Sequence, residues 1–442
     1  MPATIGFDAM CTSCRVEAEP CNYGDCARMG FRAGSIAYSR FSVLSDPPTL
    51  DSALLAKIRK HILSDVDGIK PGESACGWTG GRHLFDISFT PESILFGSGL
   101  LLGFRIDSVR VPPEIKKAYI AMAEESHLVV GKDGGSYLPR AARKEAREEA
   151  LRRIDEEVAN GRYRAPKHAA IWWDFATNTM LAPVSSEKDV EMLKTLVDDT
   201  FGVRIAPRAS GTLAYDLLGE RGLSGAFDDA HAEAFSAPPA DIEGAVDQGQ
   251  KMSRTRPEVP WANTAGESKD FLGNTFLFWL CWQAETNEGL FETEAGEIAL
   301  IVDRMIDLEC AWGLSGKTSV RGSGPLRRME TVQAFKGGKW PRKVGLMLHA
   351  FGQNFEFVLQ GDRMEVSALK LPKPEEKPQS LRQAIEMRLD QFASFDRAFS
   401  SLFAMFVRDR FSPAWPTRRG QIDQWVTELG SVRKTVSLAE MA

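Results

Sequence analysis

Four cysteines lie close together near the start of the chain, in the spacing C-x2-C-x6-C-x4-C: Cys11, Cys14, Cys21 and Cys26. Four thiolates at such short spacing can bind Zn²⁺ tetrahedrally, and a short segment without a core of its own would need such a crosslink. The spacing matches no common zinc knuckle, and no histidine lies nearby. A disulfide framework is not expected, because the first residues do not read as a secretory signal. The cluster is a metal candidate, but we favour the interpretation of residues 1–28 as an N-terminal extension.

A second motif could bind phosphate. Residues 311–318 (AWGLSGKT) fit the relaxed pattern of a phosphate-binding loop, which ends in Gly316-Lys317-Thr318. In that mechanism a strand precedes the loop and a helix follows directly, so that N–H groups at the helix start point at phosphate. Two glycines and a proline between residues 322 and 325 interrupt such a helix. We therefore expect a hairpin loop, and a nucleotide-dependent enzyme using Lys317 is the alternative function.

Other catalytic arrangements find no support in the sequence. The six histidines are scattered, without a metal-ligand spacing such as H-E-x-x-H, and no G-x-S-x-G nucleophile elbow occurs. Adjacent acidic pairs such as Glu124–Glu125 point away from each other on a helix, which suits solvation better than a shared proton. We expect no catalytic residue and no cofactor.

A basic segment between residues 140 and 167 is more informative. Its first four cations stand at i, i+3, i+4 and i+7 and so lie on one helical face: Arg140, Arg143, Lys144 and Arg147. We expect Leu151, Ile154 and Val158 to continue that face. Three further cations precede the next strand: Arg162, Arg164 and Lys167.

Cations in this arrangement can pair with the phosphates of nucleic acid without reading bases. A solvated helix with i,i+4 ion pairs, such as Lys144–Glu148, explains the same pattern. Charge alone leaves the two interpretations equal.

Composition limits the class of protein that carries these residues. Of the 442 residues, 43% are apolar and 26% are charged, which excludes wholesale disorder and a collagen-like chain. The longest apolar run, Phe276–Trp282, is far shorter than the roughly 20 residues of a membrane span. The 54 basic and 60 acidic residues give a net charge of −6, which argues against a uniformly basic coat but not against a local basic surface.

Hydrophobic periodicity and capping residues predict the elements that position these side chains. In the first half they predict strands at 36–43, 83–89 and 100–111, helices at 114–125 and 139–160, a hairpin of 169–174 with 179–184, a helix from Ser186 to Gly202, and a strand at 203–207. In the second half they predict a long connection over about 219–268, strands at 297–309 and 363–371, a hairpin of 344–349 with 354–360, a linker at 373–378 and a long helix from Ser380 that Pro413 ends. This order indicates an α+β fold with mixed sheets and interspersed helices.

Two aromatic segments admit a structural and a functional interpretation. Residues 271–282 and the Phe-rich helix after Ser380 could dock a partner in a protein-interaction scaffold. We favour a role in the core, because large aromatic side chains are mostly buried.

From Met29 onward the sequence resembles the bacterial recombination-associated protein RdgC family. The resemblance is carried by the first strand (MGFRAGSIAYSRFSV), by the stretch HAAIWWDFATNTMLAPVSSEKDVEMLKTLVDDTFGVRIAP and by the stretch VQAFKGGKWPRKVGLMLHAFGQNFEFVLQGDRMEVSALKL. These are packing patterns rather than catalytic signatures, and they cover most of residues 29–411. The resemblance divides the chain into an extension (1–28), a core (29–218) with a helical arm (113–165), a linker and insertion (219–330), a C-terminal strand pair and long helix (331–411) and a tail (412–442).

The resemblance implies a ring-shaped homodimer whose basic inner surface encircles double-stranded DNA without strong sequence preference and which modulates recombinase filaments. It implies no active site, no membrane partner, and a cytoplasmic, nucleoid-associated protein. A ring confines its positive charge to the hole, so the net charge of −6 is no objection. The resemblance also favours DNA contact for the seven cations between Arg140 and Lys167, which are nominated from charge placement alone.

Overall fold

The computed structural model describes residues 30–49, 51–63, 69–130, 134–236, 256–262, 268–374 and 376–430. The four cysteines of the expected N-terminal extension, Cys11, Cys14, Cys21 and Cys26, lie outside these residues. Among the residues described, no helix is long and apolar enough to cross a lipid bilayer.

One large antiparallel sheet organises the part of the chain that the structure describes. Its thirteen strands include a continuous path in the order β10-β11-β13-β14-β15-β1-β8-β7-β4-β2. Their bounds are β1 (Ile36–Val43), β2 (Ser74–Thr79), β3 (Leu95–Phe96), β4 (Gly99–Val109), β7 (Arg164–Asp174), β8 (Thr179–Ala182), β9 (Ile205–Pro207), β10 (Leu290–Thr293), β11 (Gly296–Cys310), β12 (Thr318–Arg321), β13 (Lys339–Ala350), β14 (Gln353–Gln360) and β15 (Glu365–Lys370). A separate hairpin joins β5 (Val129–Val130) to β6 (Ser136–Tyr137).

The helices are α1 (Ser52–Lys60), α2 (Pro91–Ile94), α3 (Pro113–Ser126), α4 (Arg140–Ala159), α5 (Glu187–Phe201), α6 (Ser210–Gly219), α7 (Ser224–Asp228), α8 (Phe271–Thr286), α9 (Met329–Lys336), α10 (Leu381–Arg410) and α11 (Trp415–Glu428), with a short 3-10 turn at Pro325–Arg327. The α+β class is confirmed. The expectation of mixed sheets is wrong, because every pairing between these strands is antiparallel.

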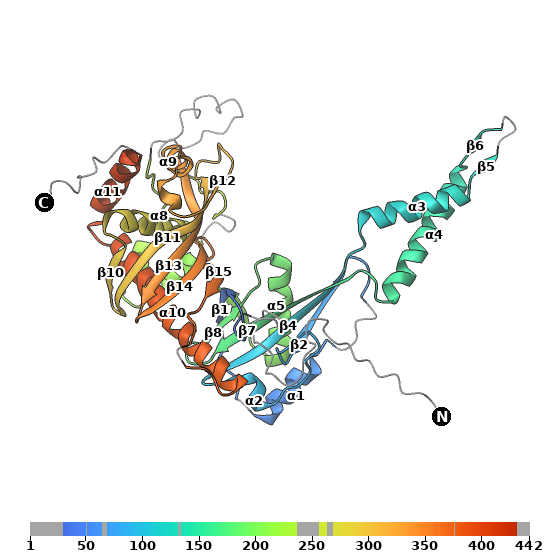
Figure 1. Ribbon diagram of the computed structural model, residues 1–442, viewed down its shortest axis with the longest axis horizontal. Helices are drawn as coiled ribbons and strands as arrows, with labels where there is room; N and C mark the ends of the chain where they lie inside the picture. The colour runs from blue at the N-terminus through green and yellow to red at the C-terminus, as the bar shows by residue number, and fades with distance from the viewer. Residues whose placement is uncertain are drawn as a thin grey trace.

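The molecule has the shape of an open V (Figure 1). An N-terminal lobe (β1–β4, β7–β9, α1, α2 and α5) forms its lower part, and a C-terminal lobe (β10–β15, α8, α9 and α11) rises on one side. An arm, residues 110–163 with α3, α4 and the β5–β6 hairpin, projects on the other side. The concave side is the space between the arm and the C-terminal lobe, and α10 runs from one lobe to the other (Figure 1).

Local sequence signals explain several helix ends. The Ser186 hydroxyl accepts a hydrogen bond from the backbone N–H of Asp189 at 3.1 Å and begins α5, which ends at Gly202 in the left-handed region (φ 69°). The Ser380 hydroxyl caps α10 in the same way, accepting from the N–H of Gln383 at 3.1 Å. Both predicted helix starts are confirmed.

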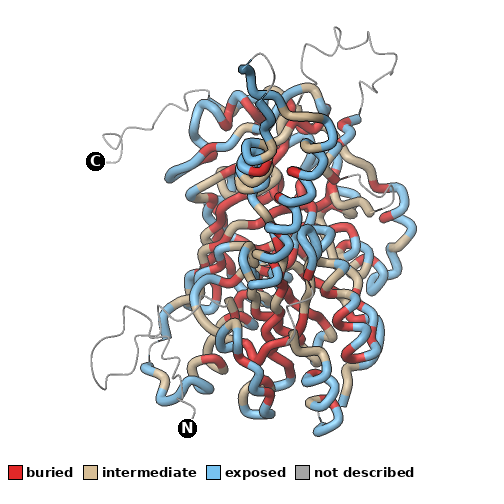
Figure 2. Tube along the Cα trace, turned by 90° about the vertical axis from the view of Figure 1, so that its right-hand side faces the viewer, coloured by how far each residue is buried: buried red, intermediate tan, exposed pale blue. Residues whose placement is uncertain are grey.

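Burial separates the core from the surface in both lobes (Figure 2). The N-terminal lobe packs Trp78, Trp173 and Phe201 between its sheet and α5. In the C-terminal lobe, the aromatic residues of α8 pack against those of α10, as in the contacts of Phe276 with Phe403 and Phe406. The core interpretation of these two aromatic segments is confirmed.

The structure corrects one sequence expectation, a strand at 83–89, and shows which elements the expected insertion and tail contain. Residues 83–89 form an irregular loop and not a strand. The expected linker and insertion (219–330) supplies α8, which is buried from Phe271 to Trp282, and three strands of the large sheet. Residues 415–428 of the expected tail form α11, whose side chains Trp415, Ile422, Trp425 and Val426 are buried.

Candidate nucleic-acid interface

The arm is a helical hairpin that carries most of the nominated cations. The chain runs out along α3, turns through β5 and β6 at the tip, and returns along α4 (Figure 1). Residues with high helix propensity (Ala, Arg, Glu and Leu) make up most of α4. Its buried side chains recur at every fourth position and include Ala146, Ala150, Ile154 and Val158. The small alanines allow α3 to approach closely.

The first four nominated cations all lie on the exposed surface of α4: Arg140, Arg143, Lys144 and Arg147. Arg143 Nε lies 3.8 Å from Glu124 Oε1 on α3, and Lys144 Nζ lies 3.7 Å from Glu148 Oε1. Arg140 and Arg147 have no carboxylate partner among the residues described. Exposed ion pairs are worth roughly 1 kcal/mol or less, so all four cations are able to meet an external anion.

The expected continuation of this face is wrong in one residue. Ile154 and Val158 are buried, but Leu151 is 36% exposed. The buried residues of α4 are spaced by four, whereas the helix has 3.6 residues per turn, so the row of buried side chains winds slowly around the helix. Leu151 lies next to this row and not in it. The cations therefore lie beside the row of buried α4 side chains that pack on α3.

The other three nominated cations follow α4 in the sequence and lie near the base of the arm. Arg162 Nη1 donates to Glu157 Oε1 at 2.6 Å, and Glu157 also accepts from the hydroxyls of Tyr119 and Tyr163. These hydroxyl hydrogen bonds, with the charge of Arg162, lower the pKa of Glu157. Lys167 Nζ donates to Asp189 on α5 at 2.9 Å.

Arg164 is half-buried at the start of β7. The structure therefore gives these three cations internal contacts, in contrast to Arg140 and Arg147.

The arm as a whole is nearly neutral. Residues 110–163 contain 11 basic and 10 acidic residues, so its electrostatic character depends on which charges of either sign lack partners. Exposed carboxylates without an ion pair among the described residues include Glu125, Glu145 and Glu156. Besides Arg140 and Arg147, two lysines of α3 are exposed without a carboxylate partner among the residues described, Lys116 and Lys117. Sequence reasoning missed them because they precede the dense basic run.

A second group of cations lines a cleft of about 460 Å³ on the C-terminal lobe. The cationic lining residues are Lys317, Arg342, Lys343 and Arg363, and the acidic ones are Asp307, Glu309 and Glu365. Glu309 Oε2 lies 2.6 Å from Arg342 Nη1 and 3.4 Å from Lys317 Nζ. The charges of this cleft largely neutralise one another, and only the three-dimensional fold brings them together.

The expected hairpin loop at residues 311–317 is confirmed. It joins β11 to β12, and Thr318 lies in β12 opposite Leu308. A strand therefore follows Lys317 where a phosphate loop requires a helix. Burial opposes ionisation of the Cys310 thiol, but hydrogen bonds from the backbone N–H groups of Trp312, Leu314 and Ser315 lower its pKa.

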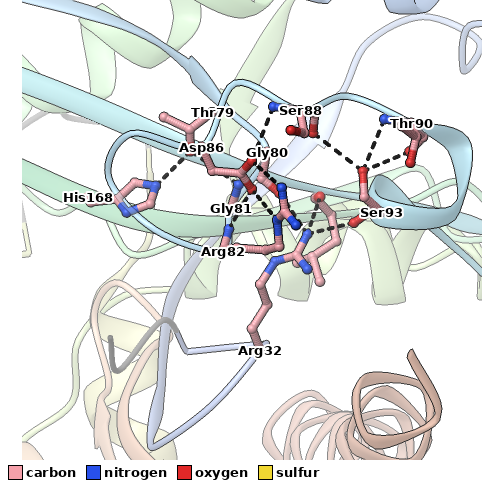
Figure 3. Close-up of polar contacts among 11 residues, drawn as sticks. Arg32, Thr79, Gly80, Gly81, Arg82, Asp86, Ser88, Thr90, Ser93 and His168 are labelled. Atoms are coloured by element: carbon pink, nitrogen blue, oxygen red, sulfur yellow. Dashed lines mark hydrogen bonds and ion pairs between the residues drawn. The ribbon is translucent and has the colours of Figure 1, made fainter. Parts of the chain in front are cut away.

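A polar network in the N-terminal lobe includes the one described histidine with a strongly shifted pKa (Figure 3). The Thr79 hydroxyl lies 2.7 Å from His168 Nε2 and accepts from the backbone N–H of Gly81 at 3.2 Å. Burial, with the nearby charge of Arg105, lowers the pKa of His168 to about 4. His168 is therefore neutral at pH 7, and its Nε2 shares a hydrogen bond with the Thr79 hydroxyl. Thr79 is 3% exposed, so this pair stabilises the interior of the lobe.

Among the described residues, no group of three or more His, Cys, Asp or Glu side chains could hold a metal ion. The zinc candidate cluster lies outside these residues. Comparison of the sequence with protein-family models and with curated proteins finds no match.

Proposed function

We propose that the chain is a non-enzymatic protein of the RdgC type that binds double-stranded DNA without sequence preference. In this proposal two copies form a ring around the duplex and modulate recombinase-mediated homologous recombination. The observation that carries the proposal is a V-shaped molecule with a projecting arm (Figure 1). On this arm Arg140 and Arg147 are exposed and have no carboxylate partner among the described residues. Two such molecules facing each other would enclose a hole, and arginine side chains pair well with phosphate.

The tip of the arm supports self-association. Val130 and Tyr137 of the β5–β6 hairpin are 72% and 57% exposed, and Leu128 and Val129 beside them are also exposed. Exposed apolar side chains gathered at one place mark surfaces that another molecule covers. A second copy of the chain would cover this tip as the ring closes. Substitution of Val130→Asp together with Tyr137→Asp should then convert the dimer to a monomer in light scattering.

DNA binding is tested by fluorescence anisotropy with duplexes of unrelated sequence over a range of salt concentrations. The affinity should fall with salt by a log–log slope of about −0.9 for each phosphate contact. Reversal of Arg140, Arg143, Lys144 and Arg147 to Glu should weaken binding equally for all sequences and flatten the slope.

Reversal of Lys57 and Lys60 to Glu is the control, to be compared with reversal of Arg140 and Arg147 alone, because these lysines are exposed on α1, away from the arm. The proposal is overturned if the pure protein shows no salt-sensitive binding of duplex DNA at low ionic strength, or if it is strictly monomeric. If the pure protein binds duplex DNA but the arm variant binds with unchanged affinity, the DNA-binding surface must consist of other residues.

A further inference from the structure

A cavity of about 230 Å³ lies beside the helix that joins the two lobes. Its lining residues come from β1, β7 and β8 of the N-terminal lobe and from helices α6 and α10. Figure 1 shows α10 running from one lobe to the other past β1, to which the pair of Arg40 and Asp396 connects it. A cavity of roughly 150 Å³ is large enough to take up benzene. This one therefore has room for an aromatic ring with a short chain.

Aromatic rings make up much of the wall of this cavity. The aromatic lining residues are Trp172, Phe392, Phe399 and Phe403, and all four are buried. The three phenylalanines stand at i, i+7 and i+11 and so share one face of α10. Trp172 comes from β7. A wall of this kind favours the apolar part of a ligand, because that part leaves water when it binds.

Helix α6 contributes both apolar and acidic side chains to the same cavity. The lining residues of α6 and its C-terminal end stand at i, i+3, i+4 and i+7, and they are Leu213, Asp216, Leu217 and Glu220. The two leucines are half-buried, and Glu220 is exposed. This face of α6 therefore places carboxylates next to the apolar wall.

The charged side chains of the lining carry more negative than positive charge. There are two arginines and four carboxylates, namely Arg40, Arg208, Asp174, Asp216, Asp396 and Glu220. Both arginines have a carboxylate partner within the cavity. Arg40 pairs with Asp396, and Arg208 Nη2 lies 2.7 Å from Asp216 Oδ2. Two carboxylates remain after these pairs are formed.

The two remaining carboxylates, Asp174 and Glu220, have no cationic partner in the described part of the chain. Asp174 accepts hydrogen bonds from the backbone N–H of Ala176 at 3.0 Å and from the hydroxyls of Thr177 and Ser98 at 2.9 and 3.4 Å. These donors are neutral, so they orient the Asp174 carboxylate without compensating its charge. A cationic ligand would supply the missing positive charge.

We propose that this cavity binds a small organic cation that consists of one aromatic ring and a short aminoalkyl chain. The ring packs among Trp172 and the phenylalanines of α10, and the ammonium group faces the carboxylates of Asp174 and Glu220. Aromatic faces also attract an ammonium group. An anionic ligand of the same shape is repelled by the excess of carboxylates. The inference does not depend on DNA binding by the arm.

The test uses the full chain and 2-phenylethylamine as the probe, in a ligand-observed NMR titration at pH 7 and low ionic strength. We expect a dissociation constant below about 1 mM, which increases with added salt. The neutral analogue 2-phenylethanol and the anion phenylacetate should each bind at least about ten-fold more weakly, because neither supplies a positive charge.

Two variants locate the bound probe. Ser400 is exposed on α10 and lines the cavity, so Ser400→Trp should occupy it and weaken binding of the amine at least about ten-fold. Glu220→Gln removes one charge and should weaken binding about three-fold. The matched controls are Ser52→Trp and Glu145→Gln, since both residues are exposed and neither lines the cavity, and they should bind like wild type.

Thermal unfolding of the four variants is measured in parallel and should equal that of wild type, because the substituted residues are exposed. The proposal is overturned if wild type does not bind the amine at about 10 mM, or if 2-phenylethanol or phenylacetate binds as tightly as the amine. It is also overturned if folded Ser400→Trp binds the amine like wild type. Should Ser400→Trp not fold, equal affinity of Glu220→Gln and Glu145→Gln for the amine overturns the proposal.

Discussion

The ion pair between Arg40 and Asp396 fastens α10 to β1, and its removal should destabilise the protein strongly. Arg40 Nη2 donates to Asp396 Oδ1 and, at 3.1 Å, to the Tyr38 hydroxyl. The guanidinium also lies over the rings of Tyr38 and Phe399, at 5.2 and 6.0 Å from their centroids. Burial alone would lower the pKa of Arg40, but the Asp396 carboxylate outweighs burial and raises it. Among the described residues, Asp396 is thus the carboxylate that compensates the buried charge of Arg40.

The size of the effect follows from the exposure of the two side chains. The Arg40 side chain is 8% exposed and that of Asp396 is 31% exposed. Loss of one partner of a buried pair costs about 3–5 kcal/mol, because the other charge stays buried and uncompensated. Water can reach the Asp396 side, so we expect Asp396→Ala to lower the free energy of unfolding by about 3 kcal/mol. The double variant Arg40→Met, Asp396→Leu should recover most of this loss, because no charge remains buried.

Urea denaturation followed by tryptophan fluorescence measures these free energies. The control is Glu294→Ala, which removes the pair with Arg408, whose side chains are 70% and 49% exposed, and it should cost less than about 1 kcal/mol. A loss below about 1 kcal/mol for Asp396→Ala would refute the reasoning. So would a double variant no more stable than Asp396→Ala.

Three further predictions concern buried groups. Burial raises the pKa of Asp270 to about 6, so the stability that this group contributes below its unfolded pKa of about 4 is lost as the pH rises through 6. The Asn side chain of Asp270→Asn can still accept from the Gly211 N–H. This variant should therefore unfold at a higher urea concentration than wild type at pH 8, but not at pH 4. Equal stability of the two proteins at pH 8 would contradict this. Gly103→Ala should lower the free energy of unfolding by about 1–3 kcal/mol in the same assay, because a Cβ there would lie 1.9 Å from Thr79 Oγ1. An unchanged free energy of unfolding would show that the strands can shift to make room for the methyl group. Phe276→Ala should lower the free energy of unfolding by about 3–5 kcal/mol, since Phe276 is fully buried. A loss below about 1 kcal/mol would mean that neighbouring side chains fill the cavity left by the ring.

Local signals in the sequence predicted elements well where one residue decides the outcome. Ser186 and Ser380 begin their helices because a hydroxyl satisfies the first free N–H, and Gly202 ends α5 because it adopts a positive φ. The hairpin of β13 and β14 was predicted equally well, from alternating apolar residues on either side of a short turn.

Prediction failed where distant contacts decide the outcome. Phe85 and Ile87 alternate with Asp86 and so imitate a strand, but a contact with Arg82 draws Asp86 inward and bends the segment into a loop. For the candidate interface, the spacing of Arg143 and its neighbours predicted exposure on α4. It gave no information on Glu124, which only the pairing of α3 with α4 brings near.

The position of β1 in the sheet has a consequence for how the chain folds during synthesis. Ile36 near the start of β1 pairs with Leu369 of β15, and on its other edge β1 pairs with β8. The ribosome must therefore release more than three hundred residues before one edge of an early strand finds its neighbour. Until then, β1 carries unpaired backbone groups that a nascent chain must shield from aggregation. We expect this protein to fold late, after translation of β15, and to depend on chaperones more than a chain whose neighbouring strands are close in sequence.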